Sequence, residues 1–124
     1  MLYLMVKHQE ADLDAVFAAL SHAARRQTLD ALGRGAASVS DLAAPHGMSL
    51  SGFMKHVKAL ESAGLIECAK EGRTVTCALA RKPLRNASDW LASRERLWSA
   101  RMDALGRHLY HREQVSPPRK SRKE

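Results

Sequence analysis

The middle of the chain carries an apolar pattern that repeats every three or four residues. Within residues 49–64 the apolar positions are Leu50, Phe53, Val57 and Leu60. This spacing puts them on one face of a helix, and we expect that face to pack against a core. Ser51, Lys55 and Lys58 fall off the apolar face. The pattern therefore predicts a helix with one buried face and one face available to a partner.

A second, shorter helix is predicted just before it. Residues 38–41 read Ser-Val-Ser-Asp, which is typical of a helix start with a capping box. We expect this helix to run from Asp41 to His46 and to end at Gly47, and we expect Ser49 to cap the helix that follows. Two helices joined by a short turn that contains glycine form a helix-turn-helix.

The segment after the second helix predicts a β-hairpin. Residues 65–69 and 74–79 favour strands, and Glu-Gly-Arg at 71–73 lies between them. A helix-turn-helix followed by such a hairpin is a winged helix, in which the helix enters the major groove. Lys70 and Arg73 at the hairpin tip can then lie along phosphates or the minor groove.

Two further helices are predicted upstream, on either side of a break near Ser21. Their apolar positions are Leu13, Val16, Phe17 and Leu20 in the first, and Thr28, Leu29 and Leu32 in the second, which ends at Gly33. Arg25 and Arg26 fall early in the second helix, where the helix macrodipole disfavours cations. We therefore expect at least one of them to have an acidic or backbone partner. A phosphate contact is the alternative.

The last apolar pattern runs from Leu84 to about His111 and has a spacing of about 3.5 residues. It predicts a helix longer than one small core can cover, so its apolar side is expected to pair with a second copy of the chain. The residues predicted to dimerise are Trp90, Leu91, Trp98, Met102, Leu105 and Leu109. A helix that folds back on its own domain is the alternative.

These elements predict a mainly α fold with a small β-hairpin: a winged helix-turn-helix with a long C-terminal dimerisation helix. We assign residues 11–111 to this domain and residues 1–10 to an N-terminal extension. Residues 112–124 have two prolines and many charges, which predicts a disordered basic tail. That tail is expected either to add nonspecific DNA affinity or to have no role. The apolar start, residues 1–6, is too short for a signal peptide or a membrane span, so a cytoplasmic protein is expected.

Length and charge agree with a nucleic-acid partner. The 124 residues suffice for one domain and are too few for a separate ligand-binding domain. The formal net charge is +7, of which residues 112–124 contribute +3. A basic chain favours a polyanionic partner, because each contact to phosphate releases a counterion. Solubility alone is the alternative explanation of this charge.

Several short runs of the sequence also resemble the ArsR-type winged-helix repressors in register. They are Ala18–Arg26, Ser40–Ala43, Met48–Leu50, Lys55–Lys58, Leu60–Glu61, Ala63–Leu65 and Glu71–Arg73. The resemblance spans roughly residues 11–109. It implies a homodimeric bacterial transcriptional regulator, usually a repressor, in which the first and last helices form the dimer interface. Met54 stands where the family often has Ser, and residues 22–24 replace an Asp-Pro-Thr run, so the resemblance does not predict the operator sequence.

The residues predicted to contact double-stranded DNA lie on the second helix and on the hairpin. They are Ser49, Ser51 and Gly52 for backbone and hydroxyl contacts, Lys55 and His56 for base-edge or phosphate contacts, Lys58 for phosphate, and Lys70, Arg73 and Thr74 on the wing. Helix packing is the alternative for His56. A dimeric interaction module that does not read DNA is the competing function. We expect no enzyme, because the sequence contains no arrangement typical of an activated nucleophile or an acid–base pair.

Metal binding has little support, and no cofactor is predicted. The family's cysteine pairs near the helix-turn-helix have no counterpart, because residues 36–42 lack cysteine. His108 and His111 lie three apart, and Glu95 could approach from a partner's helix. However, Leu97 occupies the place where the family's pattern would need a histidine. A zinc site from His108, His111 and Glu95 is therefore a minor alternative, and the effector is unknown.

Cys68 and Cys77 are predicted to face one another across the hairpin if its turn centres on residues 72–73. Directly opposed residues in a non-hydrogen-bonded pair have Cα atoms about 4.5 Å apart, near the lower edge of disulfide geometry. A labile, redox-sensing bond is one interpretation. Two idle, reduced cysteines are the favoured one, because cytosolic thiols stay reduced.

Overall fold

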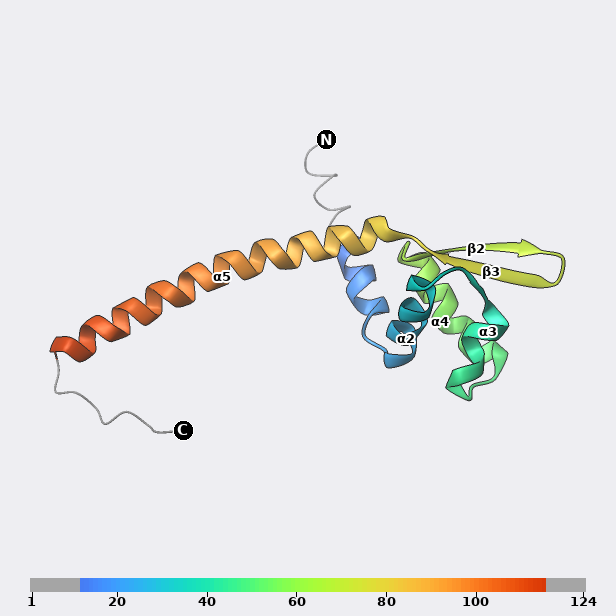
Figure 1. Ribbon diagram of the computed structural model, residues 1–124, viewed down its shortest axis with the longest axis horizontal. Helices are drawn as coiled ribbons and strands as arrows, with labels where there is room; N and C mark the ends of the chain where they lie inside the picture. The colour runs from blue at the N-terminus through green and yellow to red at the C-terminus, as the bar shows by residue number, and fades with distance from the viewer. Residues whose placement is uncertain (1–11, 116–124) are drawn as a thin grey trace. The chain divides into compact units, whose positions relative to one another are not determined.

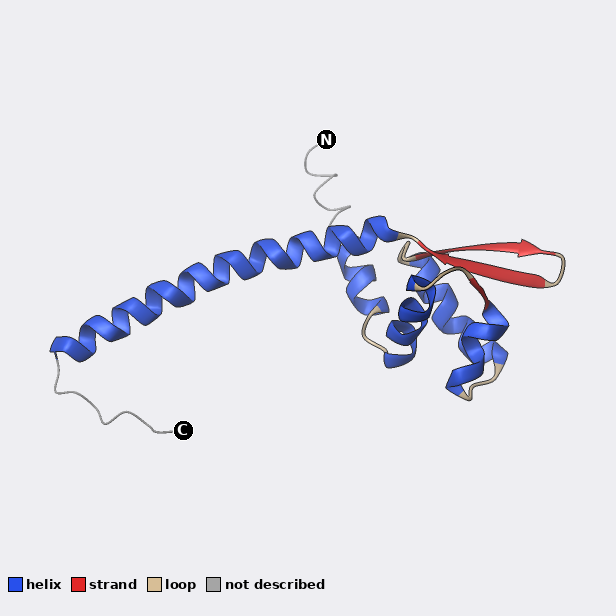
Figure 2. Ribbon diagram, in the orientation of Figure 1, coloured by secondary structure: helices blue, strands red, loops and turns tan. Residues whose placement is uncertain are grey.

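The computed structural model describes residues 12–115 and consists mainly of helices, with three short strands that form one sheet (Figures 1 and 2). Residues 12–19 are helical. The elements that follow are α2 (Ala23–Gly33), β1 (Ala37–Ser38), α3 (Val39–Ala43), the 3-10 helix η1 (Ala44–His46), α4 (Leu50–Ser62), β2 (Ile66–Glu71), β3 (Thr74–Leu79) and α5 (Arg81–Val115). This order confirms the predicted mainly α fold with a small antiparallel wing and a long C-terminal helix.

The ends of the predicted elements differ slightly from the structure. The short helix begins at Val39 instead of Asp41 and is followed by η1. The last helix continues through residues 112–115, so the prediction that these residues belong to the disordered tail is wrong. The predicted N-terminal extension, residues 1–10, and the rest of the predicted tail, residues 116–124, lie outside the described residues.

Side-chain caps define the helix-turn-helix. The hydroxyl of Ser38 accepts a hydrogen bond from the Asp41 N–H at 3.1 Å, which begins α3. Gly47 has a φ of 62°, a left-handed conformation that glycine adopts without steric cost, and it ends η1. The hydroxyl of Ser49 accepts from the Gly52 N–H at 3.1 Å and begins α4. These contacts confirm the predicted boundary between the two helices.

The sheet has the strand order β1-β3-β2, and its strands are antiparallel. Glu71 pairs with Thr74, so Gly72 and Arg73 form the two-residue turn of the hairpin, which extends beyond α2, α3 and α4 in Figure 1. β1 was not predicted. Its two residues, Ala37 and Ser38, pair with β3 at Cys77 and Thr76, and a strand this short has no apolar alternation to reveal it.

The core lies where the first helices, α4 and the base of the wing meet. Its most buried members are Phe53, Leu60, Leu65, Ile66, Val16, Val57, Thr28 and Cys77. Phe53 of α4 is 0% exposed. The prediction that Leu50 faces the core is wrong, because its side chain is 54% exposed. At this end of α4 the ring of His46 stacks on Phe53, with centroids 5.3 Å apart, and covers the core.

The chain divides into two compact units, Met1–Ser88 and Asp89–Glu124. α5 begins in the first unit, where Ala87 is buried and Leu84 packs against the core. In the second unit Trp90 is half-buried, and the Arg94 guanidinium lies 5.3 Å from its ring centroid. Other large apolar side chains of α5 are exposed there; they are Leu91, Leu97, Trp98, Met102, Leu105, Leu109 and Tyr110. Within residues 12–115, no helix is both long and apolar enough to cross a membrane.

Candidate nucleic-acid interface

α4 has two chemically distinct faces. Phe53, Val57 and Leu60 are buried on one of them, as the sequence predicted. Lys55 and Lys58 are exposed on the other. A lysine ammonium is a mobile donor that suits phosphate oxygens and the acceptor edges of guanine. The exposed face of α4 therefore presents cations on a helix that the core holds in place.

The N-terminus of α4 adds hydroxyl and backbone donors to this face. Ser49 and Ser51 are exposed, and their hydroxyl oxygens lie 3.4 Å apart. A Cβ added at Gly52 would lie 3.1 Å from the Ser49 hydroxyl, so glycine leaves the cap room to form. The first N–H groups of a helix lack intrahelical acceptors, and the macrodipole makes this end attractive to anions. This end of α4 is chemically suited to a phosphate.

The wing presents a second group of cations. Lys70 lies on β2, Arg73 in the turn and Thr74 at the start of β3, and all three side chains are exposed. Glu71, also exposed, offsets part of this charge. The structure thus gathers the predicted wing residues at one end of the hairpin, on an element distinct from α4.

His56 lies apart from the two lysines, on the side of α4 that contacts α2. Its Nδ1 accepts a hydrogen bond from Nε of Arg25 at 3.0 Å, and its ring centroid lies 5.6 Å from that of His22. Burial lowers the pKa of His56, and the nearby Arg25, His22 and His46 lower it further. The ring is therefore neutral near pH 7, with its proton on Nε2. These contacts make His56 a helix-packing residue.

Both arginines at the start of α2 have backbone partners. NH1 of Arg25 donates to the Ala18 carbonyl at 3.3 Å, and NH1 of Arg26 donates to the Leu20 carbonyl at 2.7 Å. The expectation of an acidic or backbone partner is confirmed for each. The contact of Arg25 with His56 was not predicted, since 31 residues separate the two and no local pattern relates them.

Cys68 and Cys77 are directly paired across the hairpin, as predicted. Both are free cysteines, and their sulfur atoms are 2.8 Å apart. Burial, the Cys77 thiol and the Glu61 carboxylate together raise the pKa of Cys68 to about 12, and burial is the largest of the three causes. Cys68 is therefore held as a thiol, whereas the nucleophile in thiol oxidation is the thiolate.

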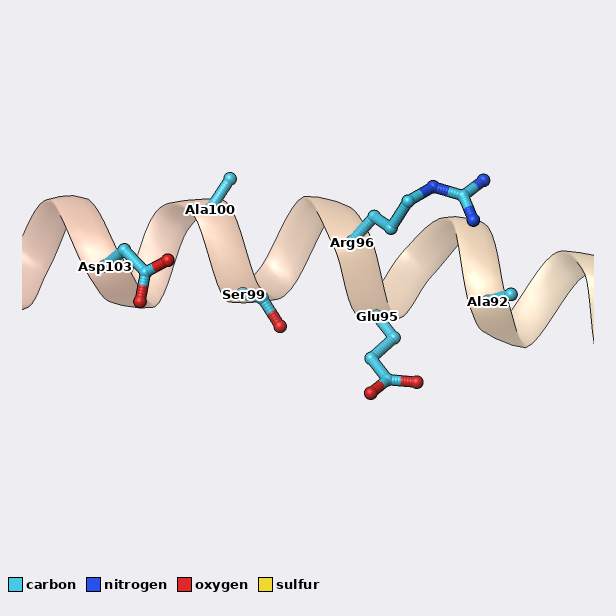
Figure 3. A pocket seen from close by; sticks show the side chains of 6 residues that line it. All are labelled: Ala92, Glu95, Arg96, Ser99, Ala100 and Asp103. Carbon is cyan, nitrogen blue, oxygen red and sulfur yellow. The ribbon is translucent and has the colours of Figure 1, made fainter.

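The predicted metal ligands do not come together within one chain. His108 and His111 are exposed on α5, and the described part of the chain, residues 12–115, contains no group of three or more His, Cys, Asp or Glu residues placed to hold a metal ion. Glu95 lines a hollow along α5, and Figure 3 shows the side chains around it. Its lining residues are Ala92, Glu95, Arg96, Ser99, Ala100 and Asp103, all from this one helix.

Comparisons with known proteins agree with this geometry. A family model described as a helix-turn-helix domain matches residues 20–69. The crystal structure of an ArsR family transcriptional regulator is 42% identical with a TM-score of 0.70, and the match covers 73% of this chain and 93% of that one. An ArsR-like transcriptional regulator from Rhodococcus sp. RHA1 is 32% identical with a TM-score of 0.66, covering 86% of this chain and 94% of that one.

A third similar structure is the homodimeric winged helix-turn-helix DNA-binding domain, fragment 1–100, of a possible ArsR-family transcriptional regulator from Mycobacterium bovis. It is 28% identical with a TM-score of 0.56, and the match covers 77% of this chain and 87% of that one. No curated protein matches the chain. The two faces of α4 and the wing agree with these matches, two of which cover 73% and 86% of the chain. This chain therefore belongs to the ArsR family of winged helix-turn-helix DNA-binding transcriptional regulators.

Proposed function

We propose that the protein is a homodimeric transcriptional repressor that binds an imperfect inverted repeat in double-stranded DNA. The observation that carries the proposal is the division of α4 into a buried apolar face and an exposed face with Ser51, Lys55 and Lys58. In a helix-turn-helix the second helix enters the major groove and contacts base edges with its N-terminal part. α4 has the cap, the charge and the anchoring for this role.

The DNA contacts are divided between the two elements. The hydroxyls of Ser49 and Ser51 bind phosphate at the start of α4, where Gly52 has no side chain to keep the DNA backbone away. Lys55 binds a base edge or phosphate, and Lys58 binds phosphate. Lys70, Arg73 and Thr74 of the wing bind the neighbouring backbone. His56 supports α4 from behind through its hydrogen bond with Arg25.

Dimerisation is supported by the exposed apolar side chains of α5. Leu91, Trp98, Met102, Leu105 and Leu109 recur at three-, four- and seven-residue intervals and are 47–64% exposed. Such a row on a helix is typical of a surface that pairs with another helix, and the similar domain from Mycobacterium bovis is a homodimer. Two-fold symmetry would place two copies of α4 about 34 Å apart, on successive major grooves.

Gel-shift binding under reducing conditions tests the proposal. The protein should bind the DNA upstream of its own gene more tightly than a scrambled duplex of the same length and composition. Replacing Lys55 by Ala should weaken specific binding by about 1–3 kcal/mol. Replacing Arg73 by Ala should weaken binding to both duplexes alike and reduce the salt slope by about one.

Lys82→Ala is the matched control, because Lys82 is exposed at the start of α5 and outside the proposed interface. It should bind as the wild type does. Equal, salt-sensitive binding of the wild type to both duplexes would contradict sequence reading and would favour a dimeric interaction module.

A further inference from the structure

Two exposed apolar side chains flank the cap of α4. Met48 precedes Ser49 and is 39% exposed, and Leu50 follows it and is 54% exposed. Single apolar residues are common on protein surfaces and carry no information alone. Here, however, the pair stands at the end of the helix expected to meet base edges, beside the hydroxyls of Ser49 and Ser51.

The position of Leu50 within α4 separates it from the core. It begins a row that continues at Met54 and Lys58, because residues four apart lie on the same side of a helix. Lys58 is exposed, Met54 is half-buried, and the core at this end is covered by His46 stacked on Phe53. Leu50 is thus the apolar start of a row that ends in an exposed cation.

We infer that Leu50, assisted by Met48, is a specificity-determining residue that reads the 5-methyl groups of thymine in the operator. In the major groove thymine alone among the four bases carries a methyl group, and apolar side chains recognise it by contact. Serine hydroxyls and lysines cannot replace this contact, because they bind hydrogen-bonding edges and phosphates. The inference rests on the proposed function, since it requires α4 to lie in the major groove.

Uracil in place of thymine provides a direct test, because it removes the methyl group and keeps the Watson–Crick pairing. The operator is first located by footprinting in the upstream DNA, and two duplexes of it are then made, one with thymine and one with uracil throughout. Removing one methyl contact of roughly the size of a buried methylene should weaken wild-type binding by about fourfold in each half-site, and therefore by about 15-fold for the dimer. Leu50→Ala should bind the two duplexes with nearly equal affinity.

Leu50→Ala is expected to fold, because the side chain is exposed and alanine has the best helix propensity; circular dichroism checks this. Lys58→Ala is the matched control: it should weaken binding to both duplexes and keep the preference for thymine. A wild type that binds both duplexes equally, or a Leu50→Ala variant that keeps the full preference, would overturn this inference alone. Failure to prefer the upstream DNA over a scrambled duplex would overturn the proposed function and the thymine reading with it.

Discussion

Nε of Arg25 donates a hydrogen bond to Nδ1 of His56 at 3.0 Å and thereby joins α2 to α4. Arg25 also donates to the carbonyl of Ala18, at the end of the first helix. One guanidinium therefore contacts the helix in front of α2 as well as the helix with the proposed DNA-reading face. The contact fixes the orientation and tautomer of His56, because only the neutral ring with a bare Nδ1 can accept it.

A double-mutant cycle should detect this contact. Arg25→Ala and His56→Ala should each destabilise the protein, and the pair should show a coupling energy of about 1 kcal/mol, since a hydrogen bond with one charged partner at a half-buried site has this order of strength. Urea unfolding of the four proteins supplies the measurement. Arg26→Ala with His56→Ala is the control cycle, because Arg26 donates to the Leu20 carbonyl instead. Additive effects in the Arg25 cycle would show that the contact contributes nothing.

The pKa of His56 predicts how stability changes with pH. Burial, Arg25, His22 and His46 all lower this pKa below 6.5, its value in the unfolded chain. Below pH 6.5 the unfolded chain therefore binds a proton that the folded protein resists. The contribution of His56 is fully present above pH 6.5 and is lost as the pH falls toward the folded-state pKa. Thermal unfolding from pH 7.5 to 5 should show a falling midpoint.

His56→Gln is the comparison for this experiment, because glutamine keeps an acceptor for Arg25 and does not titrate. Its unfolding midpoint should fall less steeply over the same pH range. Identical slopes for the two proteins would assign the pH dependence to other groups.

The helix-turn-helix could be predicted from sequence because its signals are local. Ser38 and Ser49 each accept a hydrogen bond from the backbone N–H three residues later in the chain, and the left-handed turn between the helices requires Gly47. The hairpin register followed in the same way, since the turn at Gly72 and Arg73 sets which residues face each other. Each of these features depends on residues next to each other in the chain.

The remaining features depend on residues that only the fold brings together. Leu50 fits the apolar period of α4, yet it lies one turn beyond the core edge that His46 and Phe53 define. A helical period predicts which face of the helix a side chain lies on. It does not predict whether the core extends as far as that side chain. For the same reason the sequence leaves both a DNA contact and helix packing open for His56, and only the fold identifies its partner, Arg25 on another helix.

The raised pKa of Cys68 predicts slow alkylation of the folded protein. A pKa of about 12 leaves far less thiolate at pH 8 than the ordinary value of 9.0. Iodoacetamide should therefore modify Cys68 roughly 100-fold more slowly, or slower still, than it modifies the unfolded chain. Mass spectrometry of the digested protein over time, with and without denaturant, provides a separate rate for each cysteine. Equal rates in the folded and unfolded chains would show that the pair is an accessible, reactive thiol site.

A charge in the apolar row of α5 should separate the proposed dimer. Trp98 lies within that row, with Leu91 and Leu105 one heptad away on either side, and its side chain is 52% exposed. Trp98→Glu would bury one negative charge from each copy in the proposed interface, at a cost of several kcal/mol, while an exposed site in the monomer tolerates the change. Sedimentation should show a monomer, and operator affinity should fall because one α4 contacts only a half-site.

Ala100→Glu is the matched control for this substitution. Ala100 is exposed on the same helix and lies on the side opposite the row, two residues beyond Trp98. This variant should remain dimeric and bind DNA nearly as the wild type does, which shows that an added negative charge on α5 is not by itself the cause. A dimeric Trp98→Glu protein would place the interface on another surface. Operator spacing would then no longer follow from α5, because the distance between the two copies of α4 depends on which surfaces meet at the two-fold axis.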